Sequence, residues 1–317
     1  MDYRILGRSG VKVSPLCLGG MYFGWRNDEA GSVAIVLQAL DLGINFIDTA
    51  NVYASSVSEQ YVGKALQGKR DQVVLATKFR WGMGDGPNDE GTHRLHIRMQ
   101  VENSLRRLQT DRIDLYQMHN PDPVTPVEET LEALTDLVRQ GKVLYIGTSN
   151  FPAWQLVEAQ WVSERRNLTR FACEQPHYSL FDRRLEQEII PVCEKYGIGI
   201  IPWCPLDGGW LTGKYKRGAP PPSGSRAIEE KWDLESPESM RQFDALERLT
   251  KMAVSRGKTI SQFALAWLLA NPAVTAPIIG PRTREQLEDN MGALGWSFTA
   301  EELAAVDEVV APGSEVS

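Results

Sequence analysis

Cysteine is scarce in this sequence, and the few cysteines are not arranged for metal binding or redox chemistry. Cys17, Cys173, Cys193 and Cys204 stand far apart, and no Cys-x-x-Cys pair occurs. This spacing excludes the usual cysteine metal sites and a redox pair of neighbouring thiols. We therefore expect a reduced, cytoplasmic protein in which the thiols at 17, 173 and 204 act as small buried apolar groups.

Long apolar runs and clusters of basic residues are also missing. The longest apolar runs, such as 263–270, are far shorter than the roughly 20 residues of a membrane span. The first ten residues contain no apolar signal core, so export is not indicated. The chain carries 34 Lys and Arg against 41 Asp and Glu, a formal net charge of −7, and no basic stripe. We expect neither nucleic acid nor a membrane as a partner.

What the sequence does contain is a regular alternation of two patterns. Short runs rich in apolar and β-branched residues predict strands at 13–18, 45–48, 73–78, 113–118, 143–148, 170–174, 198–202 and 274–279. Apolar residues at helical spacing predict helices at 30–42, 59–66, 95–108, 127–139, 153–165, 185–196 and 243–270, the last broken near Gly257. A final helix is expected from Thr283, where Thr-Arg-Glu-Gln resembles a capping box.

Eight apolar strands, each followed by a helix, predict a parallel sheet buried on both faces. Such a sheet closes most naturally into a (β/α)8 barrel, which needs about 250 residues. No shift in composition divides the 317 residues, so we expect one α/β barrel domain over residues 1–317. Residues 4–13 predict an N-terminal β-hairpin that plugs the barrel floor.

Two long loops are expected at the mouth of this barrel. They span residues 79–92 and 207–240, and each begins where a predicted strand ends. Loops in that position lie at the C-terminal face, where the active sites of barrels are found. The second loop contains Ala-Pro-Pro-Pro-Ser-Gly-Ser, a composition that packs poorly and is often mobile.

Four ionisable residues fall at or just after the ends of neighbouring predicted strands: Asp48, Tyr53, Lys78 and His119. In a barrel these ends converge on one mouth, so the four side chains can share a pocket. A lysine cation beside a tyrosine lowers the pKa of the phenol, and a carboxylate holds that cation in place. A neutral histidine can hydrogen-bond a carbonyl oxygen as charge builds on it. Each of these residues, taken alone, can also be explained by a purely structural role, such as an ion pair between Asp48 and Lys78.

These residues lie within a series of motifs that resembles the signature of the aldo-keto reductases. The motifs follow one another over essentially the whole chain: LDLGINFIDTA at 40–50 with Tyr53 and Ser58-Glu59 after it, LRRL at 105–108 with Asp111, IDLY at 113–116 with His119, GTSNF at 147–151, PWCPL at 202–206, LTGKY at 211–215, and Ile279-Gly280.

The resemblance implies a (β/α)8 barrel that reduces aldehydes and ketones with NADPH. It implies Tyr53 as the general acid, His119 as the residue that orients the carbonyl, and Lys78 with Asp48 as the pair that tunes Tyr53. The chain departs from the usual pattern at Asn51 and at Ala54. An alanine in place of glycine at 54 reduces backbone freedom, which puts the local turn in question.

A cofactor site is expected after the seventh and eighth strands, where barrels commonly bind phosphate. Gly208 and Gly209 let backbone amides approach a pyrophosphate closely, and Arg282 can pair with a 2′-phosphate, which favours NADPH over NADH. By the resemblance, Ser149, Asn150 and Gln175 bind the nicotinamide carboxamide, Trp203 stacks on its ring and Asn290 contacts adenine. The full expected set is Met21, Ser149, Asn150, Gln175, Trp203, Pro205, Leu206, Gly209, Lys214, Gly280, Arg282, Gln286 and Asn290.

Aromatic residues on the mouth loops are candidate walls of a substrate pocket. This group consists of Tyr22, Phe23, Trp25, Trp81 and Trp210. An aromatic mouth suits apolar or aromatic carbonyl compounds and also stacks on sugars. Ketosugars, aromatic aldehydes and steroid- or toxin-like ketones all remain open as substrates.

Two other motifs are not expected to carry chemistry. Residues 208–214 fit Gly-x4-Gly-Lys, but Tyr215 stands where a phosphate-transfer loop needs Ser or Thr. His93 and His96 have no carboxylate motif that would complete a metal site. We therefore expect no metal.

Two alternatives to a reductase stay open. In the first, the protein is a different barrel enzyme in which Lys78 forms a Schiff base with a ketose, as aldolases do. The potassium-channel β subunits also resemble this family and bind NADPH while regulating a partner. A homo-oligomer is possible but is not indicated by the sequence.

Overall fold

The computed structural model describes residues 1–316, and its centre is a sheet of eight parallel strands. Their order in the sheet is β10-β3-β4-β5-β6-β7-β8-β9. The strands are β3 Cys17–Gly19, β4 Phe46–Asp48, β5 Val74–Phe79, β6 Ile113–Met118, β7 Val143–Ser149, β8 Phe171–Gln175, β9 Gly199–Ile200 and β10 Ile278–Ile279.

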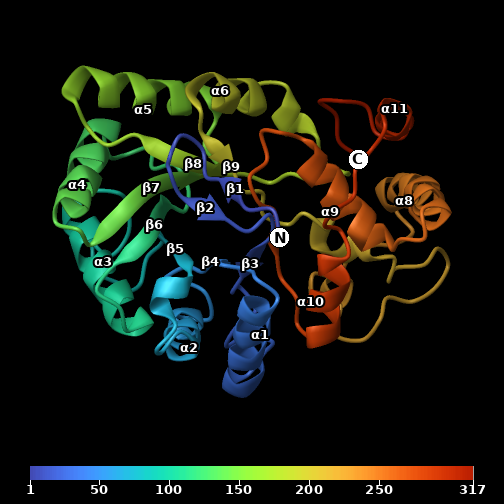
Figure 1. Cartoon of the computed structure of the whole chain (residues 1–317), viewed down its shortest axis with the longest axis horizontal. Helices are drawn as coiled ribbons and strands as arrows, with labels where there is room; N and C mark the ends of the chain where they lie inside the picture. The colour runs from blue at the N-terminus through green and yellow to red at the C-terminus, as the bar shows by residue number, and fades with distance from the viewer. Residues whose placement is uncertain (317) are drawn as a thin grey trace.

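The two edge strands of this sheet meet, so the sheet closes on itself. Backbone N–H groups of Thr275 and Ile278 donate to the carbonyls of Ile200 and Pro202 at 2.7 and 2.8 Å. Figure 1 shows the strands arranged around a central axis with helices outside them. The predicted (β/α)8 barrel and the eight predicted strands are confirmed.

Helices follow the strands and cover the outside of the barrel. Those described are α1 Glu29–Asp41, α2 Val57–Ala65, α3 Arg94–Leu108, α4 Val127–Arg139, α5 Ala153–Arg166, α6 Ile189–Tyr196, α7 Arg226–Glu229, α8 Pro237–Ser255, α9 Ile260–Ala270, α10 Arg284–Met291 and α11 Ala300–Asp307. α8 lies beyond the ring next to α9, and α11 lies near α8 (Figure 1). No helix among these residues combines the length and the apolar content needed to cross a bilayer.

The C-terminal part holds one helix more than the sequence pattern predicts. The expected break near Gly257 is present, since α8 ends at Ser255 and α9 begins at Ile260. The expectation that the final helix starts at Thr283 is wrong, because α11 follows α10. Thr299 and Glu302 form a complete capping box at the start of α11. This pair is the sequence signal that predicts the start of this last helix.

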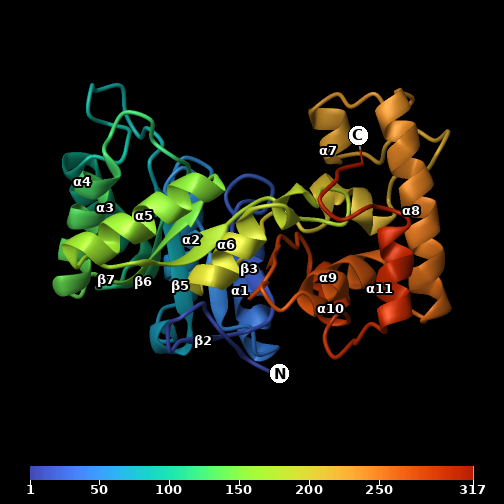
Figure 2. The ribbon, with the colours of Figure 1, turned by 90° about the horizontal axis from the view of Figure 1, so that it is seen from above.

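The apolar core has two layers, one inside the barrel and one between the strands and the helices. The inner layer contains Leu6 and Val13 of the N-terminal hairpin together with strand residues such as Phe46 and Leu115. The hairpin pairs β1 Arg4–Ile5 with β2 Lys12–Val13 in antiparallel register. It therefore closes the barrel floor, at the end opposite the long loops (Figure 2).

The loop 207–240 contains secondary structure of its own. It contains a 3₁₀ turn, the short helix α7 and the first turn of α8. Trp210 stacks on Trp232 with ring centroids 6.1 Å apart and planes 8° apart, and Trp210 also contacts Phe243 of α8. These aromatic contacts pack the start of the segment against its middle and against α8.

The turn of the hairpin generates a prediction about stability. Gly7 has φ +53, and a Cβ there would lie 2.3 Å from the carbonyl oxygen of Ala172, whereas a Cβ on Gly10 would meet nothing within 4 Å. We expect Gly7→Ala to lower the free energy of unfolding by about 1–3 kcal/mol. Gly10→Ala, the matched control, should change it by less than about 1 kcal/mol. Equal unfolding curves in urea for the two variants would contradict this role for the turn.

Candidate active site

A cavity of about 730 Å³ opens at the carboxyl ends of the barrel strands. Asp48, Tyr53 and His119 line one end of it, and Lys78 lies fully buried beneath. All thirteen residues expected to bind a cofactor line the same cavity: Met21, Ser149, Asn150, Gln175, Trp203, Pro205, Leu206, Gly209, Lys214, Gly280, Arg282, Gln286 and Asn290.

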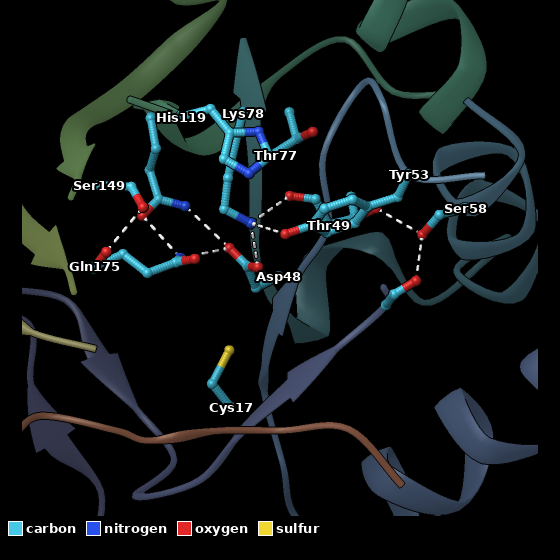
Figure 3. Close-up of polar contacts among 12 residues, drawn as sticks. Cys17, Asp48, Thr49, Tyr53, Ser58, Thr77, Lys78, His119, Ser149 and Gln175 are labelled. Atoms are coloured by element: carbon cyan, nitrogen blue, oxygen red, sulfur yellow. Dashed lines mark hydrogen bonds and ion pairs between the residues drawn. The ribbon is translucent and has the colours of Figure 1, made fainter. Parts of the chain in front are cut away.

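Lys78 is the centre of the polar cluster at the cavity floor. Its Nζ donates to Asp48 Oδ2 at 2.5 Å, to the carbonyl oxygen of Thr49 at 2.9 Å and to the hydroxyl of Tyr53 at 3.1 Å. Figure 3 shows these three acceptors grouped around the ammonium. The three N–H donors of a protonated lysine are therefore all in use.

Burial and the neighbouring charges together determine the protonation states of Lys78 and Tyr53. Burial acts to lower the pKa of Lys78, but the Asp48 carboxylate and Tyr53 outweigh it, so the pKa is raised and the ammonium persists. Burial raises the pKa of Tyr53, and Lys78 lowers it by a smaller amount. The expectation that Lys78 makes Tyr53 more acidic than a free phenol is thus wrong in the net direction. The phenol is neutral, and the ammonium opposes the effect of burial.

His119 stands across the cavity floor from Tyr53. The two rings meet edge to face with centroids 5.7 Å apart. Burial lowers the pKa of His119 to about 3, and the positive charges of Lys78 and Arg80 add to this effect. The imidazole is therefore neutral at physiological pH. Its Nδ1 is buried and has no hydrogen-bond partner among residues 1–316.

The loop that carries Tyr53 has an unusual backbone. Ala54, Ser55 and Ser56 have φ values of +48, +52 and +76, a left-handed conformation that L-residues seldom adopt in succession. Ser56 Oγ donates to the carbonyl of Asn51 at 2.8 Å, which closes the turn. The alanine at 54 is thus accommodated in the conformation that would favour glycine, and strain of this kind is typical of functional sites.

The carboxyl ends of β7 and β8 form the neighbouring wall. Ser149 Oγ donates to the carbonyl of Gln175 at 2.8 Å, and Trp203 Nε1 donates to Asn150 Oδ1 at 2.9 Å. Trp203 also stacks on His177, with ring centroids 4.5 Å apart. These contacts hold a flat indole beside two polar side chains, an arrangement that suits an aromatic ring bearing an amide.

Four cations and, besides Asp48, two carboxylates, Glu285 and Asp289, line the cavity. Lys214 and Arg282 lie there as expected, and Arg26 and Arg226 line the same region. Burial and the charges of Arg282, Arg226 and Arg26 lower the pKa of Lys214 to about 8. Arg26 pairs with Glu229 and Arg226 with Glu230, so the positive charge of this group is partly neutralised. Lys214 and Arg282 add positive charge that suits a ligand with phosphate groups. The sequence pattern did not single out Arg26 and Arg226, because each lies in a mouth loop with no motif around it.

Gly209 makes room for one of these cations. Its φ is +100, and a Cβ there would lie 2.3 Å from Lys214 Nζ. Gly209 therefore allows the ammonium to lie against the backbone of the loop after β9. The group that approaches this glycine is thus the Lys214 ammonium, and the approach of a pyrophosphate to the backbone amides stays a prediction.

The five candidate pocket walls divide into three groups. Tyr22 lines the cavity. Phe23 and Trp210 are buried in the core and do not line the cavity, so their assignment as pocket walls is wrong. Trp25 is exposed and does not line the cavity. The ring of Trp81 meets that of His119 edge to face, with the two ring centroids 6.4 Å apart.

His93 and His96 mark a helix start. His93 Nδ1 accepts from the backbone N–H of His96 at 3.3 Å and so caps α3. Residues 1–316 contain no group of three or more side chains placed to hold a metal ion.

Residues 15–311 match the model of the Aldo/keto reductase family. The "Uncharacterized oxidoreductase YrpG" of Bacillus subtilis (strain 168) is 44% identical over 99% of this chain and 98% of its own length. Two proteins named "Probable voltage-gated potassium channel subunit beta", from Oryza sativa subsp. japonica and Arabidopsis thaliana, are each 38% identical over 93% of this chain and 91% of their own.

With these matches, the parallel barrel with its buried Lys–Asp pair beside a phenol is that of a barrel oxidoreductase. The chain belongs to the aldo/keto reductase family, which its match over nearly all its length establishes.

The buried carboxyl of Glu174, on β8, leads to a prediction about how the stability of the protein depends on pH. It accepts from Thr148 Oγ1 at 2.5 Å and from the backbone N–H of Phe151 at 3.0 Å, yet burial raises its pKa from 4.5 to about 7. A carboxyl with a raised pKa in the folded state stabilises the protein below its unfolded pKa. That contribution is lost as the pH rises through the folded value.

We therefore expect the stability of the wild type, relative to Glu174→Gln, to fall by up to about 3 kcal/mol between pH 4 and pH 8. Urea unfolding at several pH values measures this difference. A difference that stays constant, or that grows in favour of the wild type as the pH rises, would contradict the burial of an ionisable carboxyl here.

Proposed function

We propose that this protein reduces an aldehyde or a ketone to an alcohol with NADPH, with Tyr53 as the proton donor. The substrate is a small carbonyl compound. The observation that carries the proposal is the placement of Tyr53, Lys78 and His119 at the floor of a cavity whose other end holds four cations.

The proton step is supported by the bonding of Tyr53. Its hydroxyl oxygen accepts from Lys78 at 3.1 Å, so its own proton is free to be donated toward the cavity. Burial keeps the phenol protonated until a substrate oxygen arrives. The Lys78 ammonium then stabilises the phenolate that remains after the transfer.

Neutral His119 supports the same step from the opposite side. An uncharged imidazole can donate one hydrogen bond to a carbonyl oxygen without giving up its proton. The substrate oxygen would thus lie between the Tyr53 hydroxyl and the His119 ring, held by two donors. Reduced nicotinamide, when bound, supplies the hydride.

The residues around the cavity suit NADPH in particular. Ser149, Asn150 and Gln175 offer polar groups for the carboxamide, and Trp203 offers a face for the ring. Arg282 and Lys214, with the two further arginines, offer positive charge for the pyrophosphate and the 2′-phosphate. A 2′-phosphate distinguishes NADPH from NADH, and paired cations favour the former.

A Schiff-base aldolase is disfavoured by the state of Lys78. A nucleophilic lysine must be neutral, whereas this ammonium donates three hydrogen bonds and has a raised pKa. The second candidate is a regulatory subunit that binds the cofactor with little turnover. It is favoured by the relatives named as potassium channel β subunits, and a panel of carbonyl substrates distinguishes it from a reductase.

Tyr53→Phe tests the proton donor. We expect the rate of carbonyl reduction to fall at least about 100-fold, because the donor is removed. Affinity for NADPH, measured by quenching of tryptophan fluorescence, should stay unchanged. Reduction at the wild-type rate by the variant would show that another group supplies the proton.

Arg282→Ala tests the 2′-phosphate role. Loss of a charge-assisted hydrogen bond should weaken NADPH by about tenfold or more, with a much smaller change for NADH. Arg284, the exposed first residue of α10, gives a matched control, because Arg284→Ala removes the same charge outside the cavity. Equal losses for the two cofactors would remove Arg282 from the 2′-phosphate site.

A further inference from the structure

Gln117 is a fully buried polar residue that the proposed chemistry does not use. It lies on β6, two residues before His119, and pairs in register with Lys78 on β5 and with Gly147 on β7. Its side chain is 0% exposed, and it does not line the cavity. A buried amide of this kind needs partners, and its partners are the residues of the site.

The first partner is Asp48. Gln117 Nε2 donates to Asp48 Oδ1 at 3.0 Å, and Gln175 Nε2 donates to the same oxygen at 3.0 Å. The other carboxylate oxygen, Oδ2, accepts from Lys78. Asp48 is thus held by an ammonium on one side and by two amides on the other (Figure 3 shows Lys78 and Gln175 directed at it).

These hydrogen bonds determine whether the nitrogen or the oxygen of each side-chain amide faces Asp48. An ionised carboxylate only accepts hydrogen bonds, so the atom that each amide turns toward Asp48 is its nitrogen. Gln117 must then turn its oxygen away from Asp48, and that oxygen accepts from Gln175 Nε2 at 3.2 Å. Both N–H groups of Gln175 are engaged as a result.

The remaining atom of Gln175 is the one that a ligand meets. Gln175 lines the cavity, and its Oε1 accepts no hydrogen bond within residues 1–316. With its nitrogen held inside the barrel, Gln175 offers the cavity an acceptor. An acceptor at this place selects a donor from the ligand, and the NH2 group of a carboxamide is such a donor.

We propose that Gln117 is a positioning residue that assembles both halves of the site, and this rests on the proposed function. It orients Asp48, which holds Lys78 and so Tyr53, and it fixes the amide of Gln175 toward the nicotinamide. A single buried side chain therefore couples the proton donor to the cofactor pocket.

The space around Gln117 shows how closely the strand packing is matched to it. A Cβ on Gly147 would lie 3.2 Å from Gln117 Cγ and 2.6 Å from Cys173 Sγ. The thiol of Cys173 also approaches Gln117 Oε1 at 3.8 Å. Small neighbours on β7 and β8 thus make room for an amide inside the barrel.

Gln117→Leu removes the amide and keeps a similar volume. We expect the affinity for NADP+ to fall roughly tenfold, because Gln175 is no longer held in one orientation. Affinity for adenosine 2′,5′-bisphosphate, which lacks the nicotinamide, should stay unchanged. Calorimetry measures both ligands on the wild type and the variant and needs no turnover, so the result stands apart from any test of reductase activity.

Gln160, a buried glutamine on α5, provides the control. Gln160→Leu should leave the ratio of the two affinities as in the wild type, even where the stability falls. The proposal would be overturned if Gln117→Leu weakened the binding of both ligands equally, or weakened neither. A role in folding alone predicts no selective effect on binding of the nicotinamide half.

Gln117→Glu gives a second test. A protonated carboxyl can donate to Asp48 and accept from Gln175 as the amide does, but its ionised form would repel Asp48. We expect this variant to exceed Gln117→Leu in NADP+ affinity and in turnover at mildly acidic pH, and to lose that advantage as the pH rises. Equal impairment of the two variants at every pH would also overturn the proposal.

Discussion

The site depends on one buried ion pair, between the ammonium of Lys78 and the carboxylate of Asp48. Burying a charge is costly unless its partner and its hydrogen bonds are supplied in good geometry. Here Lys78 donates to three acceptors, one of which is Tyr53. The cation can therefore act on the phenol from inside the barrel, where little water screens it.

The barrel supplies the geometry for this pair through the register of its strands. Asp48 ends β4, and Lys78 lies near the end of the neighbouring β5. Gln117 stands beside Lys78 on β6. Because parallel strands place their carboxyl ends on one face, residues far apart in sequence converge without any long loop. The mouth loops then need only to supply the phenol and the cations.

The repeating part of this architecture could be predicted from the sequence. Strand and helix periods fix eight repeats, and the positions of Asp48, Lys78 and His119 at strand ends follow from those periods. Arg226 and the burial of Trp210 could not be predicted, because they depend on how the loop 207–240 folds over the mouth. The net rise in the pKa of Tyr53 also escaped prediction, since burial is a property of the whole packing.

The central claim is that the Lys78 charge acts on Tyr53 against the effect of burial. Its most direct test is an NMR titration of Tyr53, labelled with carbon-13 at the tyrosine ring, in the wild type and in Lys78→Met. Removal of the ammonium leaves burial and the Asp48 charge unopposed, so we expect a higher pKa of Tyr53 in the variant. An unchanged or lower pKa in the variant would contradict it.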